Sequence, residues 1–257
     1  MVKITKSRIE LAGQTALVTG GTRGLGRDVA SRLAEAGCDV FVCGRNAPES
    51  LPEGVHFSTC DVRDPQQAAA FVNEAALKTG RVDIIVNNAG GSPPHEAATA
   101  SSRFAEALVR LNMLAPLYMA QAAHPYMAKA KYGCIVNIAS VSGARPSPET
   151  AVYGAAKAGL LNLTQSLAQE WGKDGIRVNA IIAGLMSTEN AESTYGNAGA
   201  QVKVGASMPL GRMGTGDDIA GAVLWLCSDL AEWVSGARVQ VDGGGERPYF
   251  LELVRGN

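Results

Sequence analysis

Short runs of apolar, largely β-branched residues alternate along the chain with longer segments in which apolar residues recur at helical spacing. In the first such unit, the apolar run 15–19 ends in two glycines and is followed by Leu25, Val29 and Leu33, each four residues apart. This alternation is typical of βαβ units and predicts an α/β fold, a doubly wound parallel sheet with helices on both faces. The predicted strands, about seven in number, lie at residues 15–19, 39–43, 56–60, 83–87, 134–139, 177–182 and 238–241.

The helical segments between these strands have recognisable ends. Gly37 closes the first helix, and Pro65 stands at the first turn of the second. Further along, residues 184–216 are rich in Gly, Ser, Ala and Asn and are expected to form a long mobile loop with short helices. No repeat, charge block or proline-rich linker divides the chain, so residues 1–257 are expected to form a single domain. After the first helix, the predicted helices lie at residues 65–79, 102–131, 150–172 and 217–228.

Composition narrows the classes of function. The 257 residues carry 23 Lys+Arg against 24 Asp+Glu, a formal net charge of −1, which argues against a nucleic-acid-binding protein. No apolar run approaches the length of about 18 residues that a membrane span needs, and the N-terminus lacks the apolar core of a signal peptide. Scattered cysteines and isolated histidines match no disulfide or metal spacing. We therefore expect a cytoplasmic enzyme with no metal site, no nucleic-acid partner and no membrane association.

A glycine-rich segment, TGGTRGLG at residues 19–26, connects the first predicted strand to the first helix. Glycines allow positive φ and let a phosphate approach the backbone, while the free N–H groups of a helix N-terminus attract the anion. A plain tight turn would have a similar composition, so the segment alone is weak evidence. Its position between a strand and a helix favours the binding of a dinucleotide.

With the motifs that follow it, this segment makes the chain resemble the short-chain dehydrogenase/reductase family over about residues 10–245. The resemblance implies a single-domain Rossmann-type fold. One departure is Ala183-Gly184, where the family usually has Pro-Gly, and it bears on the stiffness of that loop entrance. Besides TGGTRGLG for TGxxxGxG, the matches are residues 87–90 for NNAG, Asn112, Ser140, Tyr153 and Lys157 for the Asn-Ser-Tyr-Lys tetrad, and residues 177–180 and 242–244 for two later landmarks.

Tyr153 and Lys157 are four residues apart and would share one face of a helix. A nearby ammonium favours the phenolate, and lowering a tyrosine pKa from about 10 to neutrality requires roughly 4 kcal/mol. We expect Tyr153 to donate a proton to a carbonyl oxygen and to act as a base in the reverse direction. Ser140, at the end of a strand, would hydrogen-bond the substrate oxygen. Taken singly, these residues are also explained as a packing aromatic, a surface lysine and a capping serine.

The resemblance also implies roles that spacing alone does not show. Asn112 would hold a water that relays protons toward Lys157, and Lys157 would contact the nicotinamide ribose as well. Asp61 and Val62 match the pair that contacts adenine, and Met186 and Thr188 match positions that hold the carboxamide and a nearby phosphate. The full set of expected cofactor contacts is Gly20, Thr22, Arg23, Gly24, Leu25, Gly26, Arg45, Asp61, Val62, Asn88, Ala89, Gly90, Tyr153, Lys157, Gly184, Met186 and Thr188.

The end of the second predicted strand bears on which dinucleotide is used. NAD-selective enzymes generally place an acidic residue there, which binds the adenosine ribose and repels a 2′-phosphate. In this chain the position is Gly44, followed by Arg45, and Arg23 lies in the glycine-rich segment. Two guanidiniums can bind a phosphate through charge-assisted hydrogen bonds. We therefore expect NADP(H), the alternative being that both arginines are simply solvated.

These features predict an oxidoreductase that transfers hydride between NADP(H) and a small-molecule ketone or secondary alcohol. Among members of the family, the chain is similar to β-ketoacyl-carrier-protein reductases and to ketoreductases of secondary metabolism. The alternatives are a cofactor-bound regulator that has lost the chemistry and an epimerase or lyase on the same fold. The substrate itself is not specified by any motif. Arg145 would meet an anionic substrate or be solvated, and His95 is expected to be a solvated loop residue.

The segment 153–169 carries a single charge, Lys157, and its Ala and Leu residues are distributed around the whole helix. A helix that is apolar all round must be covered on both sides, and the sheet covers only one. We expect a second subunit to cover the other side, giving a homotetramer by resemblance, with a homodimer as the smaller alternative. Loops of the same chain are the other possible cover.

Overall fold

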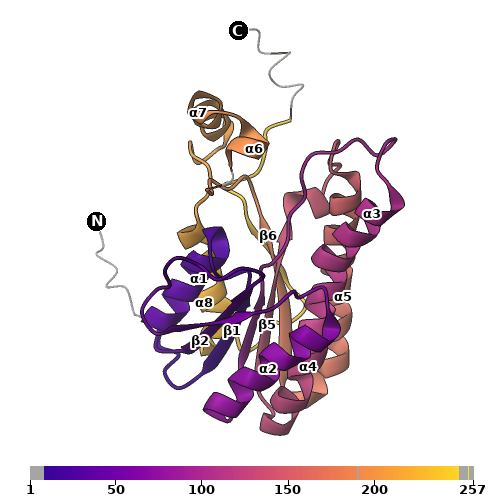
Figure 1. Cartoon of the computed structure of the whole chain (residues 1–257). Helices are drawn as coiled ribbons and strands as arrows, with labels where there is room; N and C mark the ends of the chain where they lie inside the picture. The colour runs from indigo at the N-terminus through magenta and orange to yellow at the C-terminus, as the bar shows by residue number, and fades with distance from the viewer. Residues whose placement is uncertain (1–8, 190, 249–253, 255–257) are drawn as a thin grey trace, which may run out of the picture.

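One parallel sheet of seven strands forms the centre of the computed structural model, which describes residues 9–189, 191–248 and 254 (Figure 1). Its strand order is β3-β2-β1-β4-β5-β6-β7, and all neighbouring strands pair in parallel. The predicted Rossmann-type sheet is therefore confirmed. The strands are β1 (Thr15–Thr19), β2 (Asp39–Gly44), β3 (Val55–Thr59), β4 (Ile84–Asn87), β5 (Gly133–Ser140), β6 (Ile176–Ala183) and β7 (Arg238–Val241).

Helices cover both faces of this sheet, as the alternating pattern predicts (Figure 1). On one face α1 and α8 pack together, with Leu33 and Ile219 in a shared core. On the other face the core joins α2, α4 and α5, with Phe71, Met119 and Leu167 buried in it. The helices are α1 (Gly24–Glu35), α2 (Pro65–Thr79), α3 (Ser102–Val109), α4 (Ala115–Ala130), α5 (Ala151–Trp171), α6 (Glu192–Tyr195), α7 (Ala198–Ser207) and α8 (Gly216–Cys227).

Two helix starts show how local sequence sets these boundaries. Asp64 caps α2 by accepting hydrogen bonds from the N–H groups of Gln66 and Gln67, and Pro65 occupies the first turn, where no N–H is needed. At α8, Thr215 and Asp218 form a reciprocal capping box. These caps fix helices that cover opposite faces of the sheet.

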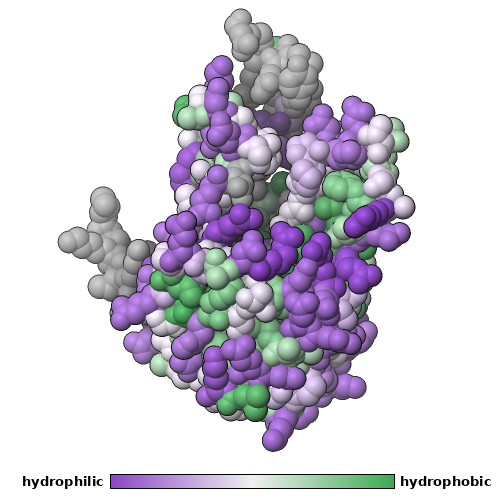
Figure 2. Space-filling view, viewed as in Figure 1, coloured by the Kyte–Doolittle hydropathy of each residue, from purple (hydrophilic) through white to green (hydrophobic). Residues whose placement is uncertain are grey.

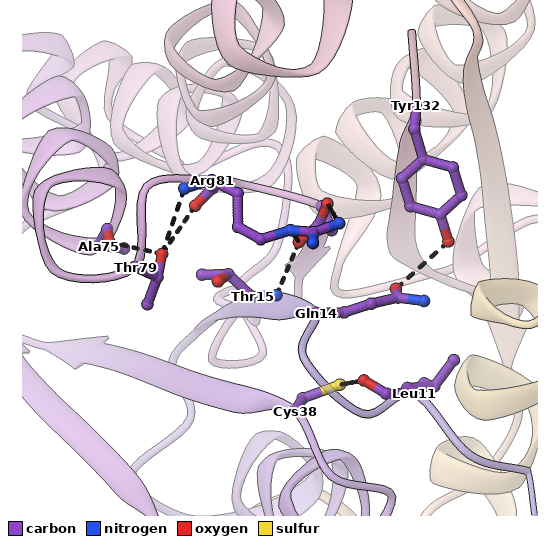
Figure 3. A network of polar contacts seen from close by, with 9 residues as sticks. Leu11, Gln14, Thr15, Cys38, Ala75, Thr79, Arg81 and Tyr132 are labelled. Atoms are coloured by element: carbon purple, nitrogen blue, oxygen red, sulfur yellow. Dashed lines mark hydrogen bonds and ion pairs between the residues drawn. The ribbon is translucent and has the colours of Figure 1, made fainter. Parts of the chain in front are cut away.

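The fourth strand begins one residue later than predicted, and directly before it lies Asp83. Its buried carboxylate accepts a hydrogen bond from the N–H of Thr15 (2.8 Å) and is paired with Arg81 (2.6 Å and 2.8 Å) (Figure 3). Beside it, the Tyr132 hydroxyl donates to Gln14 (3.2 Å) (Figure 3). This network braces the amino ends of the central strands, at the opposite edge from the glycine-rich segment.

Other strand ends shift by one residue for reasons of register. Val55 pairs with Val40, and Thr59 with Gly44, so β3 begins and ends one residue before the predicted range and β2 extends to Gly44. Cys60 lies beyond β3 and donates its N–H to Gly44. At the fifth strand, pairing with β6 extends the ladder to Ser140.

The predicted helix 102–131 is not regular throughout. A π-helical turn, Arg110–Leu114, separates α3 from α4, and Asn112 lies buried in the middle of it. π-turns inside α-helices are rare and frequently mark functional sites. The predicted helical stretch is therefore present, with a π-turn at Asn112, whose side chain is bonded to a neighbouring loop as described below.

The predicted loop 184–216 contains short helices, as expected. In Figure 1, α6 and α7 rise beyond the carboxyl edge of the sheet, and Figure 2 shows the surface hollowed between them and the end of the molecule that holds α3. Among the described residues, no helix is long and apolar enough to span a membrane.

Candidate functional site

The predicted site residues gather at the carboxyl ends of the central strands. The glycine-rich segment follows β1, Asn88 follows β4, Ser140 ends β5 and Gly184 follows β6. The chain departs in opposite directions from β1 and β4, which are neighbours in the sheet. Ligands of open α/β sheets bind at such a switch point.

Asn88 ties the glycine-rich segment to the end of β4. Its side-chain amide donates to the carbonyl oxygens of Thr19 (3.0 Å) and Gly20 (3.2 Å). In return, the Thr19 hydroxyl accepts from the backbone N–H groups of Asn88 and Ala89 (3.0 Å each). A Cβ at Gly26 would lie 2.4 Å from the Asn88 amide nitrogen, so only glycine fits there. Glycine is thus needed at Gly26 for a close approach within the protein.

The first turn of α1 faces the open side of this loop. Gly24 has φ of +52°, and a Cβ there would meet no atom within 4 Å. Arg23, at the N-cap, supplies no side-chain cap. The N–H of Gly24 instead donates to the carboxylate of Glu189 (3.2 Å), which lies beyond β6. The sequence analysis missed Glu189, and only its position next to Thr188 pointed to this region.

The side chains of Asn112 and Lys157 both lie close to Gly90. A Cβ at Gly90 would lie 2.8 Å from the Asn112 carbonyl oxygen and 3.1 Å from Lys157 Nζ. Asn112 exchanges hydrogen bonds with the backbone of Gly91 (2.9 Å and 3.1 Å) and also donates to Leu108 (3.0 Å). The asparagine therefore pins the loop after β4 to the π-turn. Its expected role in holding a water stays a prediction.

Ser140, Tyr153 and Lys157 form a cluster between β5 and α5. Tyr153 and Lys157 share one face of α5, with Nζ of Lys157 5.7 Å from the centroid of the Tyr153 ring. The lysine is buried and donates to the carbonyl oxygen of Ile138 (2.8 Å). A hydrogen bond joins Ser140 to the Tyr153 phenol. A phenol, a hydroxyl and an ammonium are thus brought together at the sheet edge, as predicted from spacing.

The electrostatic balance of this cluster differs from the one predicted. Burial raises the pKa of Tyr153, and the hydrogen bond from Ser140 lowers it by less. Burial also lowers the pKa of Lys157 to about 8. The predicted lowering of the Tyr153 pKa toward neutrality was wrong for this structure, because removal of the phenol from water is the largest influence on it and raises the pKa.

The residues near the end of β2 present positive charge to solvent. Arg23 and Arg45 are both exposed. The charge of Arg45 contributes to lowering the pKa of Asp61, although hydrogen bonds from Arg63 are the larger cause. Arg63 was not anticipated, and its side chain holds the carboxylate that was expected to contact adenine (2.9 Å and 3.1 Å).

In the loop after β6, the expected contact residues are placed in different ways. Met186 is buried and turns its side chain into the core beside Gly214. Gly184 allows the backbone of Asp242 to approach, since a Cβ would lie 2.6 Å from the Asp242 Cα. Ala183, which stands in place of the usual proline, continues the sheet by pairing with Ser140 and Val241. A proline would remove a backbone N–H at this position.

Two loop residues complete the surroundings. His95 is exposed, as expected, and lines a small cavity beside the start of α5 with its ring 5.0 Å from that of Phe104. Arg145 is paired with Glu246, from the segment after β7. This arginine is therefore not a free cation facing the site.

The fold and this cluster define an oxidoreductase of the dinucleotide-binding α/β class. Comparison with known proteins gives the family: the model described as enoyl-(acyl carrier protein) reductase matches residues 20–246. The chain belongs to the short-chain dehydrogenase/reductase family, whose members act on alcohol or carbonyl substrates with NAD(P)(H).

Similar proteins extend over nearly the whole chain. A tropinone reductase homologue of Arabidopsis thaliana is 34% identical over 250 residues, covering 93% of this chain and 95% of the relative. The 3-oxoacyl-[acyl-carrier-protein] reductase of Chlamydia trachomatis is 34% identical, with 91% and 98% covered. The ligand-free structure of Thermoplasma acidophilum aldohexose dehydrogenase superimposes with a TM-score of 0.86 at 27% identity, over 91% of this chain and 94% of that one.

Replacing Lys157 by methionine should stabilise the protein at neutral pH. The lysine pKa is about 8 in the folded chain against 10.5 for the free side chain. Below pH 8 both states hold the proton, and burying the charge costs about 3 kcal/mol. Between pH 8 and 10.5 the unfolded chain binds more protons, so wild-type stability rises with pH.

Urea unfolding at pH 7 and at pH 10.5 measures this effect. Lys157→Met should be more stable than wild type at pH 7, and the difference should shrink toward zero at pH 10.5. A difference in the free energy of unfolding that is the same at both pH values would show that the lysine charge is not what burial penalises.

Proposed function

We propose that the protein is an NADP(H)-dependent reductase or dehydrogenase acting on a ketone or secondary alcohol, with Tyr153 as the general acid and base. The observation that carries the proposal is the cluster of Ser140, Tyr153 and buried Lys157 beside the glycine-rich segment. These groups stand at the sheet edge where a family dinucleotide is bound.

The residues present fit a dinucleotide. Gly20 and Gly24 have positive φ, and the first turn of α1 offers backbone N–H groups on the side where a Cβ at Gly24 would meet open space. Ala89 and Gly90 would line the cofactor beside Lys157, and Gly90 has no room for a side chain. When bound, the nicotinamide supplies or accepts the hydride.

The proton is handled by this chain's own side chains. Because burial raises the pKa of Tyr153, the phenol holds its proton at neutral pH and is ready to donate to a carbonyl oxygen. Ser140, the hydrogen-bond partner of this phenol, would donate to the phenolate left after transfer and so stabilise it. The Lys157 ammonium stabilises the same charge from 5.7 Å, measured to the ring centroid.

The substrate is proposed only as a class. Relatives of similar identity are named for different substrates, including 2-dehydro-3-deoxy-D-gluconate in Escherichia coli and 3-oxoacyl groups on a carrier protein in Chlamydia trachomatis. Each of these substrates has a carbonyl or hydroxyl carbon that can accept or donate hydride. A cytoplasmic location is proposed as well, because all five cysteines are free and buried.

The choice of NADP(H) rests on the end of β2. Gly44 leaves no carboxylate to repel a 2′-phosphate, and the neighbouring Arg45 and Arg23 are exposed. Arg45 also lies close enough to Asp61 to lower its pKa, so its charge faces the adenine side of the site. Guanidiniums in this position suit a phosphate dianion.

Tyr153→Phe should abolish most turnover while the cofactor still binds. The variant removes the phenolic proton but keeps the ring, and loss of a general acid typically costs 10²–10⁴-fold in rate. The measurement is kcat with a panel of ketones and NADPH, alongside NADPH affinity by fluorescence titration. A kcat within a few-fold of wild type would rule out Tyr153 as the proton donor.

The double variant Gly44→Asp, Arg45→Ala should reverse or erase the preference for NADP(H). Wild type should favour NADPH over NADH in kcat/KM by about one order of magnitude or more, since each ~1.4 kcal/mol is tenfold. An aspartate fits here because a Cβ at Gly44 would be 3.4 Å from the Thr22 side chain, an ordinary contact. Equal kcat/KM for NADH and NADPH in wild type would contradict the proposal.

The outer face of α5, on which the predicted homo-oligomer depends, differs from the expected one. The leucines of α5 do not surround the helix: Leu160, Leu161 and Leu167 are buried against the sheet. The exposed face carries Ala155, Ala158, Asn162, Gln165 and Gln169, which are small or uncharged. The prediction of a helix apolar all round was therefore wrong, because three amides follow the two alanines on the outer face.

This uncharged face still suits a second copy of the chain, since charged residues are depleted at the centre of protein interfaces. We predict a homotetramer, or a homodimer as the smaller form. Multi-angle light scattering at micromolar concentration should give a multiple of 26.7 kDa. A monomer under these conditions would contradict this assembly, and an Ala158→Arg variant that dissociates would place the contact on α5.

A further inference from the structure

The contact between Glu189 and Gly24 joins two parts of the family's cofactor site. Glu189 follows Ser187 and Thr188 in the loop after β6, and its Oε2 atom accepts a hydrogen bond from the Gly24 N–H over 3.2 Å. Gly24 is the first residue of α1, so its N–H is one of the free donors at a helix N-terminus. An internal carboxylate therefore occupies a position that suits a phosphate.

We propose that Glu189 competes with the pyrophosphate of NAD(P)(H) for the first turn of α1, and so lowers cofactor affinity and speeds cofactor release. This inference rests on the cofactor binding at the glycine-rich segment. Both anions seek the same N–H and the same partial positive charge of the helix end. The contact must break, at least at Gly24, for a phosphate to take its place.

The charges around Glu189 make this contact easy to break. Glu189 is exposed, where a charged hydrogen bond gains least. One turn into α1 lies Asp28, whose pKa is raised by burial and then by the carboxylates of Asp217 and Glu189, against a smaller opposite effect of Arg27. Because the neighbouring carboxylates repel Glu189, they favour its departure when a phosphate arrives.

The loop that carries Glu189 is anchored on both sides of this residue. Ser187 donates its N–H to Gly214 (2.8 Å), Gly214 donates to Leu185 (2.9 Å), and Met186 is buried. These bonds hold the chain as far as Ser187. Beyond Glu189, Ala191 is buried and donates its N–H to Thr188 (2.9 Å). Displacing the exposed Glu189 carboxylate therefore requires only that its side chain turn away from Gly24, which leaves the sheet and the Tyr153 cluster in place.

The test is direct binding of NADPH and of NADH to purified protein, by nicotinamide fluorescence and calorimetry, with release rates by stopped flow. Glu189→Gln and Glu189→Ala should lower the Kd of both nucleotides by the same factor, roughly two- to tenfold, and slow their release. The common factor is expected because both nucleotides have the pyrophosphate. Glu192→Gln is the matched control, since it removes one exposed negative charge from the same loop.

Each outcome has a distinct meaning. Unchanged Kd values in both Glu189 variants, or an equal gain in Glu192→Gln, would overturn the competition. A gain for NADPH alone would overturn it too, because it would place the effect at the 2′-phosphate. Equal NADH and NADPH affinity in wild type would contradict the NADP(H) proposal without affecting this one. Failure of wild type to bind either nucleotide would overturn the proposed function and this inference together.

Discussion

The side-chain amide of Asn88 is the contact on which the arrangement of the site depends. It reaches the backbone of Thr19 and Gly20, nearly 70 residues earlier, and so fixes the glycine-rich segment against the end of β4. The bond forms only because Gly26 has no Cβ, which would otherwise lie 2.4 Å from the amide nitrogen. Asn88 thereby fixes the glycine-rich segment and the loop after β4 relative to each other. The sheet places the strand ends side by side, and this amide sets the position of the loops above them.

A second constraint is the burial of Lys157. A buried ammonium is costly unless hydrogen-bonded, and this one has the Ile138 carbonyl oxygen as its partner. The same burial lowers the lysine pKa and raises that of Tyr153. Desolvation thus favours the protonated phenol, and in the proposed mechanism the ammonium would stabilise the charge left after proton transfer. This division of labour suits donation to a carbonyl at neutral pH.

Sequence spacing predicted the sheet, the helix layers and the gathering of Ser140, Tyr153 and Lys157, because strand and helix periods determine which residues share an edge or a face. It failed where a distant partner decides the outcome. The carboxylate of Asp83 binds the N–H of Thr15, and Asn112, in the π-turn, binds the backbone of Gly91. Neither partner is close in sequence. The pKa of Tyr153 could not be predicted either, since burial depends on how the whole chain packs.

The two ends of the sheet show how polar groups are used differently in one fold. At the amino ends, Asp83 is satisfied by Thr15 and Arg81, so its charge contributes to order. At the carboxyl ends, the N–H of Gly24 is bonded to an exposed carboxylate from a distant loop, with like charges nearby. A contact of this kind contributes little to stability and is easily exchanged. Because exchange is what ligand binding requires, this weakly held N–H lies at the edge where the parallel strands end.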